Sequence, residues 1–268
     1  ETIWEAGIDM DFGRRLEPGF WRELIEQIYA VDVADRDRYD CLIVDEGQDF
    51  DEEWYEILKC YLTEDASVLW LEDPMQNLRG KEPVPLEGFV TYRETANFRS
   101  PTSIGNFIKN SLGMDFRQKN PLPGLGVEVH EYQEAKEQGK IAAHRINELQ
   151  RLGFDPKDIA IVSCHGQQKA VFHDVDRVGQ FKLKKFTGDY DKEAHQIYTD
   201  GQIYFETIYR FKGQQAPAVI VVDIEENFRD NDWAKRLLYC AMTRATVRLE
   251  LLVNERSEWA SKFDEARS

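Results

Sequence analysis

The chain has 268 residues, of which 42% are hydrophobic, and it carries 34 Lys and Arg against 50 Asp and Glu, a formal net charge of −16. This length and hydrophobic content allow more than one folded domain and exclude a largely disordered chain. No apolar run approaches the roughly 18 residues of a membrane span. The acidic balance argues against nucleic-acid binding through overall charge and leaves a local basic groove as the alternative.

The cysteines and histidines do not form a recognisable metal or disulfide pattern. The four cysteines, Cys41, Cys60, Cys164 and Cys240, include no CxxC pair, and the five histidines lack ligand spacing. Glu1–Ala6 contain neither a basic nor an apolar segment typical of a signal peptide. We therefore expect a reducing, cytoplasmic environment without structural zinc.

Short apolar runs recur along the chain between helix-like stretches. Runs of four to five residues without alternation are typical of strands buried on both faces of a parallel sheet. They occupy residues 41–44, 68–71, 159–162, 218–222 and 249–253.

The intervening stretches show helical spacing. Phe20, Leu24 and Ile28 share one helical face, as do apolar residues between 141 and 152. Alternating strands and helices predict an α/β fold, which we interpret as two α/β units of unequal completeness. Breaker-rich residues 79–88 predict a loop, and residues 113–126 a loop or linker.

The first strand ends abruptly in the acids Asp45 and Glu46. Ligands of open α/β sheets bind at the carboxyl ends of strands. There, one carboxylate suits a hydrated Mg²⁺ and its neighbour can orient or deprotonate a water. The plainer interpretation is an acidic helix start, which we accept for residues 51–53 because acids there complement the helix dipole.

Two further segments carry polar residues after apolar runs. Gln76 follows the second strand and can contact a phosphate or simply belong to a turn. Ser100 is predicted to cap a helix with Pro101 at its first position. Arg99 precedes that helix start unfavourably for the dipole, which indicates either a salt bridge or a phosphate contact.

Near the C-terminus, residues 206–215 precede a strand and residues 237–245 are predicted to form a helix. Arg244 falls on the apolar face of this helix. It therefore needs an anionic partner or an interface, unless the helix C-terminal dipole is sufficient to hold it.

Together, these segments resemble the motifs of superfamily 1 helicases of the UvrD/Rep kind. LIVDEGQD resembles motif II, LEDPMQ motif III, NFRS motif IV, ETIYRFKGQQ motif V and LLYCAMTRA motif VI. They occur in the family's order and cover about residues 40 to 253.

The resemblance implies a RecA-like P-loop NTPase fold of parallel sheets flanked by helices. Residues 1–96 would form the C-terminal part of the first RecA-like domain, and residues 97–268 the complete second one. It also implies ATP in the cleft between the domains and single-stranded DNA, or RNA, across their top.

The resemblance assigns roles to the residues of this sequence that match the family's motifs. Asp45 would hold Mg²⁺, Glu46 would be the catalytic base and Gln76 would sense the γ-phosphate. Arg99 and Arg244 would act as arginine fingers. The remaining transferred residues are Gln48, Lys212, Gly213 and Gln215 at the nucleotide, and Asn97, Phe98 and Thr207 at the nucleic acid.

The sequence departs from the family in several places. It contains no G-x-x-x-x-G-K-[ST] phosphate loop, so we expect a C-terminal piece of a larger helicase that is inactive without the upstream part. Gln215 replaces an acid that faces the ribose, and no stacking aromatic residues follow Gln76. The stretch between Arg99 and Thr207 is too short for the large inserted domain of UvrD and Rep.

Three functions remain open on the sequence. The first is an ATP-dependent DNA helicase or translocase, and the second is a regulatory NTPase switch that is indifferent to nucleic acid. The third is a metal-dependent phosphatase or nuclease that uses Asp45, Glu46 and Asp49. None of the three requires a membrane.

Overall fold

The computed structural model describes residues 14, 17, 19–31, 37–191 and 195–267, and the chain divides into two compact units, Glu1–Thr91 and Tyr92–Ser268. The second unit begins at Tyr92, whereas the sequence places the domain boundary after residue 96. Within this unit, Ala96 pairs with Arg117. Assignment of the two units to RecA-like domains stays a prediction. Within the described residues, no helix is long and apolar enough to cross a membrane.

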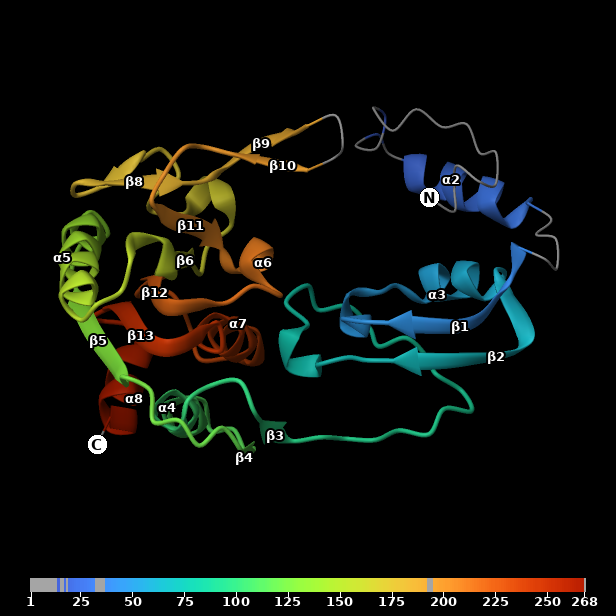
Figure 1. The fold of residues 1–268 in the computed structure, drawn as a ribbon, viewed down its shortest axis with the longest axis horizontal. Coiled ribbons are helices and arrows are strands. Elements are labelled where there is room, and N and C mark those ends of the chain that lie inside the picture. Colours follow the sequence, from blue (N-terminus) through green and yellow to red (C-terminus); the bar gives the residue numbers. More distant parts are fainter. Residues whose placement is uncertain (1–13, 15–16, 18, 32–36, 192–194, 268) are drawn as a thin grey trace. The chain divides into compact units, whose positions relative to one another are not determined.

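The first unit contains a two-stranded parallel sheet with helices beside it. Val44 pairs with Trp70 at the carboxyl ends of the two strands. The helices and strands are α2 (Phe20–Tyr29), β1 (Tyr39–Val44), η3 (Gly47–Asp49), α3 (Glu52–Lys59), β2 (Leu62–Trp70) and η4 (Pro74–Gln76) (Figure 1).

The expectation that β1 and β2 are buried on both faces is wrong. Val44 is 3% exposed, but Ile43 is 63% and Leu69 is 51% exposed. Trp70 packs edge-on against Tyr55 of α3, with the ring centroids 5.2 Å apart. Successive side chains of a strand point to opposite faces, so α3 covers one face while the described residues leave the apolar side chains of the other exposed.

The second unit is built on a seven-stranded sheet in the order β5-β13-β12-β6-β11-β8-β7. All neighbours are parallel except β7 and β8. The strands are β5 (Val127–Tyr132), β6 (Ile159–Ser163), β7 (Arg177–Val178), β8 (Phe181–Lys184), β11 (Ile203–Thr207), β12 (Ala216–Ile224) and β13 (Ala245–Asn254).

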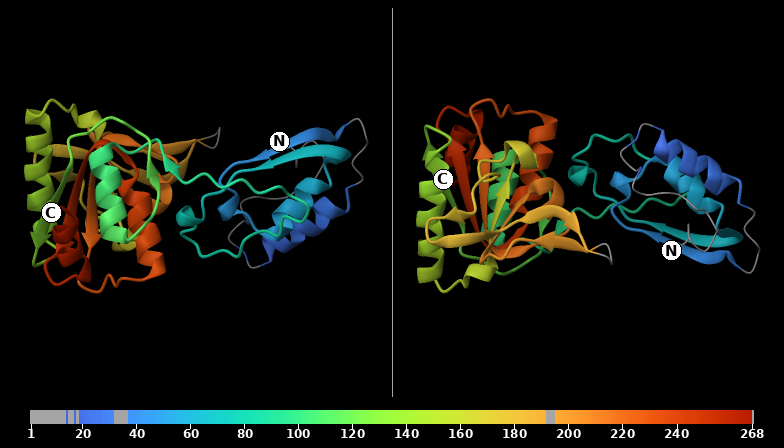
Figure 2. Two further views of the ribbon diagram at one scale, coloured as in Figure 1. Left: turned by 90° about the horizontal axis from the view of Figure 1, so that it is seen from below. Right: turned by 90° about the horizontal axis from the view of Figure 1, so that it is seen from above.

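Helices cover both faces of this sheet (Figure 2). On one face, Ala142, Ile146 and Leu149 of α5 are fully buried in the same core cluster as Ile161 and Ile220. The other four helices, α4, α6, α7 and α8, also contact the sheet; α4 contacts α7 and α8, and α6 contacts α7. The helices are α4 (Thr102–Leu112), α5 (Glu137–Arg151), α6 (Ile208–Phe211), α7 (Asp232–Met242) and α8 (Glu258–Arg267).

The apolar runs at 159–162, 218–222 and 249–253 form the centre of this sheet, as predicted, and Ile161, Val221 and Leu251 have no exposed surface. The predicted α/β class, with a mostly parallel sheet flanked by helices, is therefore confirmed. Strands need a crossover helix to pair in parallel, which explains the alternating pattern in the sequence.

Short elements complete the second unit. β3 (Ala96–Asn97) pairs with β4 (Arg117–Gln118), so the breaker-rich stretch 113–126 includes a short strand. The other short elements are β9 (Phe186–Tyr190), β10 (Gln196–Tyr198), η5 (Pro156–Asp158) and η6 (Gln167–Lys169).

Two predicted helix boundaries are wrong. The N-cap of α4 is Pro101, and Ser100 lies fully buried before it. The Oδ1 atom of Asn97 accepts the N–H groups of both Arg99 and Ser100 in the turn that precedes the helix. No side chain among the described residues caps α4: backbone carbonyls accept its first N–H groups, that of Leu122 from Thr102 at 2.8 Å and that of Pro123 from Ser103 at 3.2 Å. At the other end of the unit, α7 ends at Met242. Arg244 therefore lies in the turn between α7 and β13.

Candidate functional site

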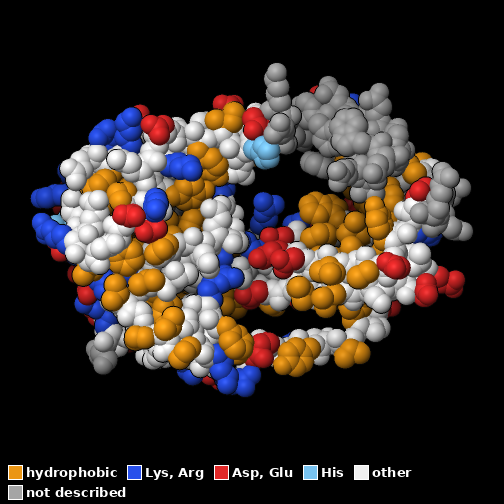
Figure 3. All heavy atoms as spheres, in the orientation of Figure 1, with side chains coloured by type: hydrophobic (Ala, Val, Ile, Leu, Met, Phe, Trp, Pro, Cys, Tyr) orange, Lys and Arg blue, Asp and Glu red, His pale blue; other side chains and the backbone are white. Residues whose placement is uncertain are grey.

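The acids after β1 occupy a strained turn at the carboxyl end of the strand. Asp45 is exposed, and its Oδ1 atom accepts the N–H of Glu46 at 2.9 Å. Glu46 has φ +56, in the left-handed region that residues other than glycine rarely adopt. Figure 3 shows acidic side chains gathered where β1 ends.

Gln48 links this turn to the end of the neighbouring strand. It is 6% exposed, its Nε2 lies 2.5 Å from Glu46 Oε2, and its Oε1 accepts the N–H of Asp73 at 2.9 Å. Gly47 makes the close approach possible, because a Cβ there would lie 2.2 Å from Nε1 of Trp70. The predicted residues Asp45, Glu46 and Gln48 thus lie at one edge of the first unit.

Gln76 belongs to the same edge. Its Nε2 donates to Asp73 Oδ2 at 2.9 Å, while Asp73 Oδ1 accepts the N–H of Met75 at 3.0 Å. Asp73 therefore joins Gln48 to Gln76, and sequence reasoning gave it no role. The Asp-Pro pair that follows the apolar run, typical of a turn start, was the available signal.

The donor set at this edge fits Mg²⁺. Carboxylate oxygens are the ligands that this ion prefers, and proteins usually bind it through one or two carboxylates together with phosphates and waters. Asp45 and Glu46 supply two carboxylates. No group of three or more His, Cys, Asp or Glu side chains among the described residues could hold a metal.

The Asn97–Arg99 turn presents two side chains on the surface. Phe98 is 66% exposed and Arg99 is also exposed, while the carbonyl of Arg99 accepts the side-chain amide of Asn120 at 2.9 Å. The side-chain Oδ1 atom of Asn97 already accepts two backbone N–H groups of this turn. An exposed aromatic ring can stack on a base, and an exposed guanidinium can contact a phosphate.

The segment after β11 combines buried and exposed predicted residues. Thr207 is 3% exposed, and its N–H donates to Glu206 Oε1 at 2.9 Å. Arg210 is paired with Glu206 at 3.0 Å. Beyond α6, Gly213 has φ +80 and is exposed, as is Gln215, while Lys212 is half-buried. Apart from Tyr209, which is 37% exposed, the exposed residues of this segment lie in its later part.

Arg244 is buried against this exposed turn. It is 1% exposed, its Nε donates to the carbonyl of Cys240 at 3.0 Å, and its NH1 donates to the carbonyl of Gln214 at 3.3 Å. Its NH2 lies 3.2 Å from Thr243 Oγ1. The C-terminal carbonyls of α7 carry partial negative charge, which stabilises the guanidinium. The structure thus joins the 206–215 segment to Arg244.

A comparison with protein families finds a similarity in this region. The model of the UvrD-like helicase C-terminal domain matches residues 202–252. This segment of the second unit is therefore similar to the UvrD-like helicase C-terminal domain. The matched residues run from the start of β11 into β13 and include Thr207, Lys212, Gly213, Gln215 and Arg244.

A solved structure also resembles the chain. It is the crystal structure of the C-terminal domain of a possible DNA helicase from Lactobacillus plantarum WCFS1, with 20% sequence identity and a TM-score of 0.42. The likeness covers 63% of this chain and 96% of that one. A search of curated proteins found no match.

Proposed function

We propose that this UvrD-like chain is part of a superfamily 1 DNA helicase or translocase, which couples ATP hydrolysis to movement on single-stranded DNA. The observation that carries the proposal is the contact between Arg244 and Gln214, at 3.3 Å, inside the family-matched residues. It joins two segments that resemble helicase motifs V and VI. In this proposal both units are parts of RecA-like domains.

The acidic edge of the first unit would bind the metal ion and activate the attacking water. Asp45 would hold Mg²⁺, and Glu46 would accept the proton of the water, oriented by the Gln48 amide 2.5 Å from its carboxylate. Gln76 would contact the terminal phosphate. When bound, Mg²⁺ would neutralise charge on the phosphate oxygens. Gln48 holds Glu46 through one hydrogen bond and the next strand through another, so the base is positioned before any ligand arrives.

Arg99 and Arg244 would stabilise the negative charge that develops on the transferred phosphoryl group. Arginine fingers contribute about 10³–10⁵ in rate in related reactions. Arg99 is exposed, whereas Arg244 donates to two backbone carbonyls and is 1% exposed. To contact a phosphate, the guanidinium of Arg244 would therefore give up a hydrogen bond to one of these carbonyls and donate to a phosphate oxygen instead. Lys212, Gly213 and Gln215 follow the same exposed turn and would contact the nucleotide.

Asn97, Phe98 and Thr207 would contact the nucleic acid. Phe98 is 66% exposed and can stack on a base. Thr207 is buried, so its contribution would be to hold the end of β11. With a net charge of −16, the chain would bind a strand through local contacts rather than through its overall field.

The test is ATPase activity of the polypeptide that includes the upstream phosphate loop, measured with and without single-stranded DNA. We expect DNA to stimulate hydrolysis strongly and Arg244→Ala to abolish that stimulation. Arg256→Ala is the matched control, because Arg256 lies outside the matched residues with 71% of its side chain exposed. We expect the 268-residue chain alone to be inactive because it lacks the phosphate loop.

Two outcomes would contradict the proposal. Hydrolysis that DNA leaves unchanged would indicate a regulatory NTPase, which no feature of the described residues favours. Equal activity of Arg244→Ala and the unchanged protein would remove the arginine-finger assignment.

A further inference from the structure

A groove of about 770 Å³ lies along the outer edge of β5, between α5 and α8. This volume is within the range of about 300–1,000 Å³ that is typical of ligand sites. Its lining comes from these three elements: Val129, His130, Glu131, Glu137, Lys140, Ile141, His144, Arg145, Asp264 and Arg267.

The floor of the groove is an open strand edge. β5 is the end strand of the sheet and pairs only with β13 among the described residues. The carbonyl groups of Gly126 and Tyr132 accept N–H groups from the β13 side. Backbone groups alternate between the two sides of a strand, so Val127, Val129 and Glu131 direct theirs to the open edge. An added strand could therefore form backbone hydrogen bonds with every second residue of β5.

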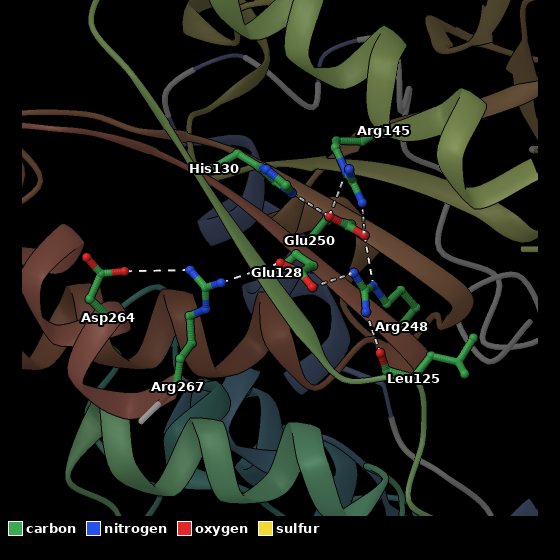
Figure 4. Close-up of polar contacts among 8 residues, drawn as sticks. All are labelled: Leu125, Glu128, His130, Arg145, Arg248, Glu250, Asp264 and Arg267. Carbon is green, nitrogen blue, oxygen red and sulfur yellow. Dashed lines mark hydrogen bonds and ion pairs between the residues drawn. The ribbon is translucent and has the colours of Figure 1, made fainter. Parts of the chain in front are cut away.

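Ion pairs fix the walls of the groove in place (Figure 4). The fully buried Glu250 of β13 pairs with His130 of β5 at 2.7 Å and with Arg145 of α5 at 3.1 Å. Glu128 of β5 pairs with Arg267 of α8 at 3.5 Å. Floor and both walls are therefore connected before any ligand binds, which lowers the ordering cost of binding.

The α5 wall presents two basic side chains that these pairs do not use. Within the described part of the chain, no ion pair within 4.0 Å involves Lys140 or His144. The pKa of the Glu137 carboxyl in the same wall is lowered by the N–H groups of Glu134 and Gln133, which it accepts, and also by the charges of Lys136 and Lys140. Figure 3 shows basic side chains gathered along the margin where α5 lies.

The spacing of Lys140 and His144 matches that of a strand. Residues four apart on a helix are separated by about 6 Å along its axis. Alternate side chains of a strand are about 6.6–6.8 Å apart. Acidic side chains at alternate positions of an added strand can therefore face both residues. Its other side chains would point toward α8, the side on which the half-buried Val127 and Val129 lie.

We propose that this groove binds an extended peptide that has acidic side chains at alternate positions and apolar side chains between them. The peptide adds as a strand to β5, and its backbone pairs with Val127, Val129 and Glu131. Its acids contact Lys140 and His144. Strand addition of this kind draws affinity from the main chain and specificity from alternate side chains. The charge of −16 repels acids at long range, but salt at 0.15 M screens that repulsion beyond roughly 8 Å.

The test is fluorescence anisotropy of a labelled peptide of four valine–glutamate repeats with the full chain. Val129→Pro removes only an outward N–H, a substitution that an edge strand tolerates, and we expect it to weaken binding about tenfold. Lys140→Glu should weaken binding by a similar factor. Lys136→Glu is the matched control, since Lys136 lies outside the groove with 80% of its side chain exposed, and should change affinity less than about twofold.

Each other outcome overturns the proposal. These outcomes are absence of binding, equal binding by a valine–lysine peptide, or an equal loss in Lys136→Glu. Dimerisation that Val129→Pro abolishes would assign the edge to a second copy of the chain instead. Should Val129→Pro fail to fold, as judged by circular dichroism, unchanged affinity in Lys140→Glu still contradicts the assignment.

Discussion

The side-chain amide of Gln48 lies 2.5 Å from the Oε2 atom of Glu46. The carbonyl oxygen of the same amide accepts the N–H of Asp73, just beyond the end of the parallel strand β2. One buried side chain thus sets the position of the proposed base and ties together the ends of two strands. The carboxyl edge of the first unit depends on it.

Replacing Gln48 by alanine should therefore destabilise the first unit. The change removes two hydrogen bonds and leaves the Asp73 N–H without its acceptor, so we expect a loss of about 1–2 kcal/mol in the free energy of unfolding. Urea unfolding followed by tryptophan fluorescence measures it. Gln168→Ala, at an exposed position, should change stability by less than about 0.5 kcal/mol. A loss in Gln168→Ala as large as in Gln48→Ala would refute the assigned role.

Gly47→Ala should disrupt the same edge by crowding. The added Cβ would lie 2.2 Å from Nε1 of Trp70, so the indole or the turn must move, at a cost of about 1–3 kcal/mol. The intrinsic fluorescence of Trp70 should shift as its packing changes. Gly166→Ala is the matched control, because nothing lies within 4 Å of the added Cβ there. Equal stability of the two alanine variants would contradict the close approach.

Glu250→Gln should destabilise the second unit by about 3 kcal/mol at neutral pH, because three basic groups lose their buried anionic partner. Burial alone would raise the pKa of Glu250, but hydrogen bonds from His130, Arg145 and Arg248 lower it below its ordinary value. A lowered carboxyl pKa stabilises the fold above the unfolded-state value of about 4.3, and this contribution disappears as the pH falls through the folded-state pKa.

The stability difference between wild type and Glu250→Gln should therefore be large at pH 7 and narrow at pH 3. Urea unfolding at the two pH values measures it. Glu265→Gln, at an exposed position of α8, provides the control and should show almost no difference at either pH. A difference that does not change with pH would argue against an ionised Glu250.

Phe98→Ala should weaken binding of an oligothymidine strand about tenfold or more, since stacking on an aromatic ring contributes about 1–3 kcal/mol per base. Anisotropy of a labelled strand at several salt concentrations measures the loss and shows whether affinity falls with salt. Leu152→Ala, which removes another exposed apolar side chain, should leave binding unchanged. Unchanged binding by Phe98→Ala would remove this residue from the proposed interface.

Local patterns in the sequence predicted some parts of the structure well. The run at 218–222 forms a central strand because four or more consecutive apolar residues are typical of burial on both faces, and the run at 249–253, apolar except for Glu250, forms the strand beside it. Glu250 interrupts the last of these runs, and this was the signal for a buried ion-pair network. Its partners His130 and Arg145 come from distant segments, so their meeting could not be predicted.

By itself, the sequence determined the α/β class, the order of the helicase-like motifs and the acids that end the first strand, because these depend on residues close together in the chain. Only the tertiary structure decided that Ile43 and Leu69 remain exposed, that Arg244 is buried against the Gln214 carbonyl, and that a groove follows the open edge of β5. The reason is physical. Burial and side-chain pairing depend on which distant elements cover a surface, and local periodicity carries no information about that choice.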